Sequence, residues 1–260
     1  MESLKLLIIG IVQGVTELLP ISSSGHILIF SEILNISSSS LILTFFHVGT
    51  TLAILLFFRE KIFKEILKKE RITFLLKIII SSIPAALIGA LFEDFISEKL
   101  RAIPITAISL IVVGIAMIII EKKSKKETEI EEVTWKQSLL MGVSQTFALI
   151  PGVSRSGITT LTGILTGLNK YIALEYSLIL GIPILLGGFV WETLKLFFKD
   201  SQAIEFTTQN IFTGLIILLV PFCVGYLALH LLKKFKKSNW LSAFGIYRII
   251  LGVFLLLISL

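Results

Sequence analysis

Six apolar runs, each long enough to cross a lipid bilayer, restrict the folds that this chain can adopt. A helix needs about 20 apolar residues to cross a hydrocarbon core about 30 Å thick. The runs occupy residues 41–58, 72–92, 103–120, 172–197, 211–232 and 241–260. Only 16% of the residues are charged, whereas soluble domains carry about 25%. The sequence therefore predicts an all-α polytopic membrane protein with six transmembrane helices in a single domain, residues 1–260.

Two further apolar segments, residues 4–34 and 135–168, are interrupted by the polar stretches "QGVTELLPISSSGH" and "LIPGVSRSGITT". Each half is too short to cross a bilayer alone, and a broken helix at membrane depth is tolerated only against protein or a wet cavity. We therefore expect two re-entrant helix pairs, each of which enters and leaves the membrane on the same face.

The loop charges predict the orientation. Lys and Arg number seven within residues 59–77, five within 121–136 and four within 233–237, whereas residues 93–102 and 199–210 have few. Cytoplasmic loops carry an excess of these residues, and six spans put all three basic loops on one side. We expect that side to be the cytoplasm, with both termini outside. The same bias explains the net charge of +6 without a nucleic-acid partner.

The two interruptions resemble each other. "QGVTELLPISSSG" and "MGVSQTFALIPGVSRSG" share a Gly-Val-Thr/Ser opening, a Glu or Gln, a Pro and a Ser-x-Ser-Gly close. Three predicted spans separate them, so the second copy is inverted in the membrane. This predicts an inverted repeat, approximately residues 1–121 and 135–260, joined by a charged cytoplasmic loop at 122–134. Such repeats place their site near the midplane, where the broken helices meet.

The first interruption has the composition of an anion site. Gln13 and Glu17 are four residues apart and share one face of a helix, which Pro20 then ends. The serines at 22–24 precede the returning helix, whose first N–H groups have no partner within the helix and attract anions. His26 lies in the first turn of that helix, within reach of the same pocket.

The second interruption repeats the arrangement with a fixed positive charge. Pro151 ends one helix, Ser154 and Ser156 begin the next, and Thr159 follows a turn later. Arg155 adds a planar guanidinium group suited to phosphate oxygens. Each interruption alone could instead be a packing kink. A charge at membrane depth, however, costs about 2.5–3.5 kcal/mol unless it is paired or wetted, so the two together favour a polyanion site.

Other polar and aromatic residues are predicted to lie at the bilayer interface. His47, near the outer start of the 41–58 run, is either an interfacial histidine or part of the site. Five charged residues near span ends are expected to contact lipid headgroups: Glu93, Asp94, Glu175, Glu192 and Arg248. Four aromatic residues are expected to lie in the aromatic belt at the interface: Trp135, Trp191, Trp240 and Tyr247.

Through these motifs the chain resembles a known family. "QGVTELLPISSSGH" is similar to the first signature of the bacitracin-resistance type undecaprenyl pyrophosphate phosphatases, and "PGVSRSGITT" resembles the second. "FFHVGTTLAILLFF" and "FGIYRIILGV" also resemble family segments. The resemblance implies hydrolysis of the C55 lipid carrier's diphosphate to its monophosphate, for peptidoglycan synthesis and bacitracin resistance. It also implies a multi-pass protein of the bacterial inner membrane whose site opens to the outer face.

The resemblance also implies roles for single residues. The catalytic positions are matched by Glu17, Ser23, His26 and Arg155, and the substrate-binding positions by Gln13, Ser22, Ser24, His47, Ser154, Ser156 and Thr159. Many members have a second Glu where this chain has Gln13, which argues against a mechanism that needs two carboxylates. The expected partners are the lipid substrate and the bilayer, with a homo-oligomer left open.

Three alternatives follow from the same residues. The nucleophile is Ser23, with His26 or Glu17 taking its proton, or it is water. Glu17 is a general base, or it holds Mg²⁺ or Ca²⁺ together with Gln13. Finally, an inverted repeat with opposed broken helices is also transporter architecture, so the site could carry a lipid phosphate across the bilayer instead of hydrolysing it.

Overall fold

The computed structural model describes residues 2–36, 40–64, 68–123, 132–199, 208–233 and 239–259. All regular structure within these ranges is helical, as predicted. The helices are α1 (Glu2–Thr16), α2 (Ser23–Leu34), α3 (Ser40–Phe57), α4 (Arg59–Phe63), α5 (Lys69–Leu91), α6 (Glu93–Phe95), α7 (Ile103–Lys123), α8 (Trp135–Ser144), α9 (Arg155–Leu165), α10 (Lys170–Lys199), α11 (Thr208–Leu232) and α12 (Trp240–Ile258). A π-helical turn, η1 (Ile96–Leu100), precedes α7, and a 3-10 segment, η2 (Gln145–Leu149), follows α8.

Five described helices are long and apolar enough to cross a membrane: Lys69–Leu91, Ile103–Lys123, Lys170–Leu196, Phe212–Leu232 and Trp240–Ile258. They match five of the six predicted runs. The sixth run falls in α3, whose apolar part is shorter, at Ile42–Phe57. Large apolar side chains cover the outward faces of the long helices, as contact with lipid requires. The chain is a multi-pass membrane protein. Most of the predicted cytoplasmic loop, residues 124–131, lies outside the described residues.

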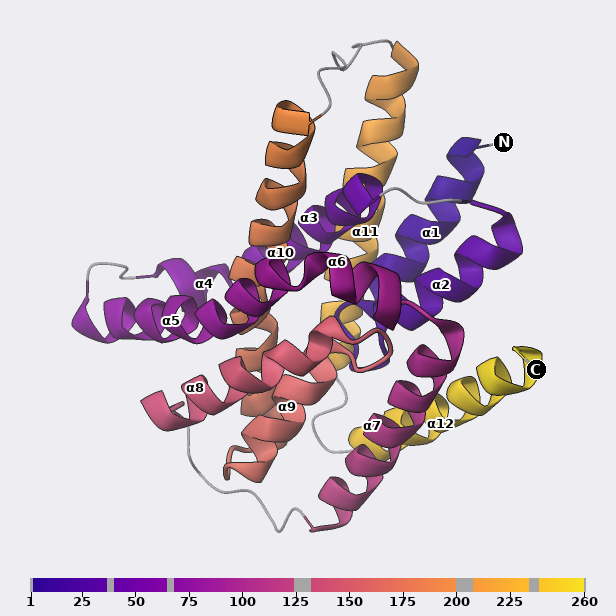
Figure 1. Cartoon of the computed structure of the whole chain (residues 1–260). Coiled ribbons are helices and arrows are strands. Elements are labelled where there is room, and N and C mark those ends of the chain that lie inside the picture. Colours follow the sequence, from indigo (N-terminus) through magenta and orange to yellow (C-terminus); the bar gives the residue numbers. More distant parts are fainter. Residues whose placement is uncertain are drawn as a thin grey trace.

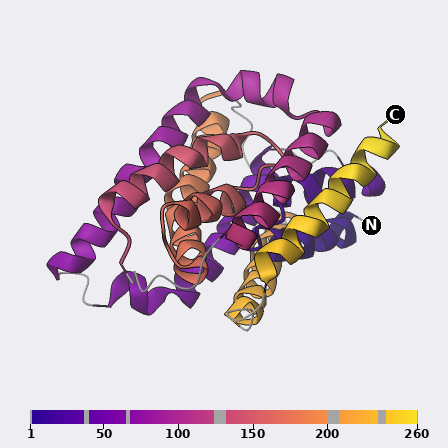
Figure 2. The ribbon, with the colours of Figure 1, turned by 90° about the horizontal axis from the view of Figure 1, so that it is seen from below.

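The two interrupted segments form two pairs of short helices. α1 packs against α2 and α11, and α8 packs against α9 and α5. Figure 1 places α1 beside α11, and Figure 2 shows α8 lying along α5. α3 and α10 pack against each other between these pairs. Each short pair is therefore held by a long helix from the other half of the chain.

Local sequence explains where the second pair begins and turns. At the start of α8, the Thr134 hydroxyl accepts a hydrogen bond from the Gln137 N–H (3.3 Å), and the Gln137 side chain accepts one from the Thr134 N–H (2.9 Å). This reciprocal cap satisfies two donors that the helix leaves unpaired. In the turn before α9, Gly152 has a φ of 92°, and a Cβ there would collide with the carbonyl oxygen of Thr106. Only glycine fits this position.

α12 packs closely along α7. A Cβ added to Gly114 would lie 2.7 Å from the Gly245 carbonyl oxygen, and one added to Gly245 would lie 2.6 Å from that of Gly114. Small residues allow two membrane helices to approach this closely. The approach brings the next turn of α12, with Tyr247 and Arg248, against both interrupted segments.

Candidate active site

The two interruptions lie against each other, as the repeat predicts. The Gly152 N–H donates to Ser24 Oγ (3.2 Å), and Ser156 Oγ donates to the Leu19 carbonyl (3.3 Å). Each contact joins one interruption to the other across more than a hundred residues of sequence. Side chains from both segments can therefore act on one ligand.

The two returning helices begin in the same way. Ser22 and Ser154 have φ values of 74° and 70°, which is unusual for residues other than glycine. Each side-chain oxygen accepts a hydrogen bond from the N–H three residues later, at Gly25 (3.3 Å) and Gly157 (3.2 Å). These two serines, predicted to bind substrate, act here as N-caps. They hold the next residue of each segment, Ser23 and Arg155, at the first position of its helix.

Glu17 is the centre of the cluster. Its Oε2 accepts hydrogen bonds from Ser23 Oγ (2.6 Å) and Gln13 Nε2 (3.2 Å), and lies 3.4 Å from His47 Nε2. Its Oε1 accepts one from the Arg155 NH2 group (2.9 Å). The Glu17 side chain is only 6% exposed, so these donors are what make a buried carboxylate tolerable. Five predicted site residues thus form one connected group.

The Arg155 guanidinium group packs against α10, where Ser177 and Gly181 make room for it. Its NH1 group donates to the Ser177 carbonyl (3.2 Å), and a Cβ at Gly181 would overlap the guanidinium group. Thr159 is fully buried; its hydroxyl donates to the Arg155 carbonyl (2.7 Å) and lies 2.5 Å from Ser177 Oγ. Thr159 therefore contacts the backbone of Arg155, and its predicted contact with substrate stays a prediction.

His26 lies apart from Glu17 and Ser23. Its Nδ1 donates to the Ser22 carbonyl (2.7 Å), which leaves Nε2 to accept a hydrogen bond from the Tyr247 hydroxyl (2.6 Å). Both ring nitrogens are occupied, so Glu17 is the base that Ser23 reaches in this arrangement. Tyr247 was predicted to be an aromatic-belt residue; its side chain is exposed, and its hydroxyl also has a buried partner in His26.

The prediction for Arg248 is wrong. It was expected to contact headgroups near a span end, but its side chain is fully buried. Its guanidinium group donates to the carbonyls of Pro20 (3.0 Å), Gly152 (2.6 Å) and Val153 (3.0 Å). Arg248 therefore joins the two interruptions to α12. Its place well inside the 241–260 run was the signal in the sequence, because a charge there is at membrane depth.

A cavity of about 350 Å³ opens beside the cluster. Ser23, Ser24 and His47 line it, so the hydroxyl that contacts Glu17 is reachable from it. Arg101 and Glu192, which adjoin the loops predicted to lie outside, also contribute to its wall. The cavity lining combines apolar residues with a few polar and charged ones, as sites for small ligands do.

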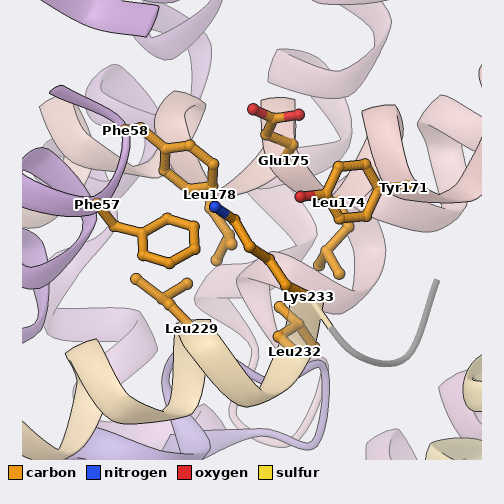
Figure 3. Close-up of a pocket in the computed structure, with 9 residues that line it drawn as sticks. All are labelled: Phe57, Phe58, Tyr171, Leu174, Glu175, Leu178, Leu229, Leu232 and Lys233. Atoms are coloured by element: carbon orange, nitrogen blue, oxygen red, sulfur yellow. The ribbon is translucent and has the colours of Figure 1, made fainter. Parts of the chain in front are cut away.

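A second pocket, shown in Figure 3, lies at the other end of α3 and α10. Phe57 and Phe58 form one side, and Lys233 extends between them and Glu175. The volume is about 10 Å³, which is room for about one water molecule. None of the predicted site residues lines this pocket, and Glu175 there pairs with Lys61 (3.1 Å). This pocket is too small for a diphosphate.

The predicted metal ligands can supply only part of a coordination shell. The described residues contain no group of three or more His, Cys, Asp and Glu side chains able to hold a metal ion. Gln13 Oε1 is buried and has no hydrogen-bond partner in the described part of the chain, whereas both Glu17 oxygens already accept hydrogen bonds. Gln13 Oε1 is therefore the one oxygen of the pair without a hydrogen-bond partner in the described part of the chain, and both residues carry the oxygen ligands that Mg²⁺ and Ca²⁺ prefer.

Comparison with known proteins identifies the family of this chain. Residues 6–254 match the family described as "Bacitracin resistance protein BacA". Proteins named undecaprenyl-diphosphatase from Enterococcus faecalis and Acetivibrio thermocellus are 34% and 37% identical to this chain, each over 99% of it and 97% of the relative. Undecaprenyl-diphosphatase 1 of Clostridioides difficile is 38% identical over 98% of this chain and 96% of its own length. The resemblance seen in the motifs is confirmed, and the chain belongs to the bacitracin resistance protein BacA family.

Proposed function

We propose that this chain is an undecaprenyl-diphosphate phosphatase, which removes the terminal phosphate of the C55 isoprenoid diphosphate carrier. Its product is the monophosphate that peptidoglycan synthesis reuses, and loss of the diphosphate confers bacitracin resistance. The full-length similarity to named undecaprenyl-diphosphatases supports this function. The single structural observation behind it is the buried Glu17, which contacts the Ser23 hydroxyl and the Arg155 guanidinium at once.

In the proposed mechanism, Ser23 Oγ attacks the terminal phosphorus. Glu17 Oε2, 2.6 Å from that oxygen, takes its proton. The bond between this phosphorus and the bridging oxygen breaks, the lipid monophosphate leaves, and water then hydrolyses the phosphoserine. Positioning and charge neutralisation supply most of the rate enhancement in phosphoryl transfer. The alternative keeps the same site: Glu17 activates a water molecule, and Ser23 only donates a hydrogen bond to the phosphate.

Arg155 and the helix starts stabilise the charge that develops on the phosphate. The Nε atom of Arg155 is buried and has no hydrogen-bond partner among the described residues, so this donor is available. When a phosphate binds, the guanidinium group transfers contacts from Glu17 to phosphate oxygens, and Glu17 becomes a stronger base. α2 and α9 begin where the two interruptions contact each other, and a helix start favours an anion.

Gln13 and Glu17 are the residues that would hold a divalent cation. Such an ion would neutralise part of the charge of the diphosphate. Gln13 Oε1 is the donor atom that needs a partner.

We further propose six spans and two re-entrant pairs in an inverted repeat, with the site open to the outer face of a bacterial cytoplasmic membrane. The packing between the two halves supports the repeat, since α1 of the first half packs against α11 of the second, and α8 of the second half packs against α5 of the first. An even number of spans puts both termini on one face, and both lie at the right-hand edge of the molecule in Figures 1 and 2. The cavity wall contains Arg101, next to a loop predicted to be outside.

Phosphate release by the purified protein tests the function. Wild-type protein in detergent should release inorganic phosphate from C55 or farnesyl diphosphate. Arg155→Lys keeps the charge and loses the planar fork, and should lower kcat about 10²–10³-fold. A transporter that performs no hydrolysis would release no phosphate, and near wild-type turnover of folded Arg155→Lys protein would contradict the assignment of Arg155.

A further inference from the structure

The cavity beside Ser23 contains polar groups that the hydrolysis of the terminal phosphate does not use. Thr106 and Ser31 both line it, and the hydroxyl of each is buried without a hydrogen-bond partner in the described part of the chain. Thr106 is fully buried. Buried polar groups are almost always hydrogen-bonded, so the two hydroxyls on this cavity wall have hydrogen bonds still to make and can donate to a bound group.

The same wall contains a positive charge. Arg101 lies between η1 and α7, is exposed, and lines the cavity. Within the described ranges its guanidinium group makes no hydrogen bond or ion pair. Glu192 also lines the cavity, but its carboxylate pairs with Lys195 and not with Arg101: Glu192 Oε1 lies 3.9 Å from Lys195 Nζ. The charge of Arg101 is therefore available to a ligand in the cavity.

The chemistry of the substrate identifies that ligand. A diphosphate lipid brings two phosphate groups, and only the terminal one reacts at Ser23. The other carries the isoprenoid chain and must lie next to it, on the side of an apolar surface. The cavity that Ser23 and His47 line is also lined by the apolar residues Ile27, Leu28 and Leu43, so it offers both polar groups and an apolar surface.

We propose that this cavity binds the lipid-linked phosphate together with the first isoprene units, and that Arg101 is the binding residue that neutralises that phosphate. Thr106 and Ser31 supply neutral hydrogen-bond donors. The inference rests on the proposed phosphatase function and extends it to the half of the diphosphate that stays on the lipid. The lipid monophosphate product occupies the same place before it leaves.

Product inhibition separates this phosphate position from the reactive one. Farnesyl monophosphate and inorganic phosphate are tested as inhibitors of farnesyl diphosphate hydrolysis by the wild type, Arg101→Ala, Thr106→Val and Lys99→Ala. Arg101→Ala should raise the inhibition constant of farnesyl monophosphate about tenfold, the effect of losing one charge-assisted contact. The constant for inorganic phosphate, which binds at Arg155, should change less than about twofold. Thr106→Val should act in the same direction and more weakly.

Lys99→Ala is the matched control, because Lys99 is an exposed cation on the preceding turn that does not line the cavity. It should change neither constant. Equal changes for the two inhibitors, equal effects of Lys99→Ala and Arg101→Ala, or no change in Arg101→Ala would each overturn the proposal. If the wild type released no phosphate, the proposed function would fail. Calorimetric titration of the same variants with farnesyl monophosphate would then decide the binding site by itself.

Discussion

At the scale of single residues, neighbouring serines have different tasks. The Ser23 hydroxyl contacts Glu17, whereas Ser22 caps α2. Ser23→Ala should therefore lose far more activity than Ser22→Ala, because the latter removes no group that reaches Glu17. Losing the cap in Ser22→Ala should lower the free energy of unfolding by about 1 kcal/mol. Steady-state phosphate release and thermal unfolding in detergent measure the two effects.

Equal losses of turnover in the two variants, with both proteins folded, would favour water as the nucleophile. Ser24→Ala is a useful third variant, since Ser24 lines the same cavity but accepts from the Gly152 N–H. It should weaken the contact between the two interruptions and leave the Ser23–Glu17 pair in place.

Sequence reasoning identified the residues of the cluster better than their individual tasks. Spacing predicted that Gln13 and Glu17 share a face, and the motifs predicted that Ser23 and Arg155 approach them. The sequence could not show that Ser22 and Ser154 are N-caps, because neighbouring serines are distinguished only by their backbone conformation, here a positive φ. Arg248 was misassigned because it was grouped with residues near span ends, although it lies well inside the 241–260 run, at the part of α12 that contacts both interruptions.

At the scale of a helix, the surface of α10 that supports Arg155 can be tested without touching the cluster. Gly181→Ala places a methyl group where the guanidinium lies. We expect the displaced Arg155 guanidinium group to lower kcat about 10–100-fold, since moving a catalytic group by about 1 Å can lower the rate about 100-fold. Phosphate release at saturating substrate is the measurement.

Gly188→Ala is the control for this prediction. It lies on the same helix, and a Cβ there has nothing within 4 Å. The alanine should raise helix stability by about 0.5–1 kcal/mol and leave turnover unchanged. Full activity of Gly181→Ala would show that the position of Arg155 on α10 does not matter for catalysis.

Hydropathy predicted the long helices well because a membrane span is a local property of sequence. Five runs appear as long apolar helices within a few residues of the expected ends. The interruptions were also predictable, since Pro, Gly and serine runs end or begin helices locally. Contacts between helices could not be predicted from local sequence; one example is the packing of α12 along α7 through Gly114 and Gly245.

At the scale of the whole molecule, the two halves of the chain complete each other. α1 of the first half rests on α11 of the second, and α8 of the second rests on α5 of the first. Glu17 and Ser23 come from one half, and Arg155 from the other. The repeat in the sequence indicated two related halves, but not that each supports the other's short helices. Neither half alone contains a complete cluster, so we expect both to fold together.

The orientation of the whole molecule decides which side of the membrane supplies the substrate. Ser97 and Glu132 are exposed and lie in loops predicted to be outside and inside, respectively. In a Cys223→Ser background, a cysteine at Ser97 should react with a membrane-impermeant thiol reagent in intact cells. A cysteine at Glu132 should react only after permeabilisation. The loop charges require this pattern, because Lys and Arg are retained on the cytoplasmic side. The opposite labelling would reverse the orientation and place Arg101 and the cavity mouth toward the cytoplasm.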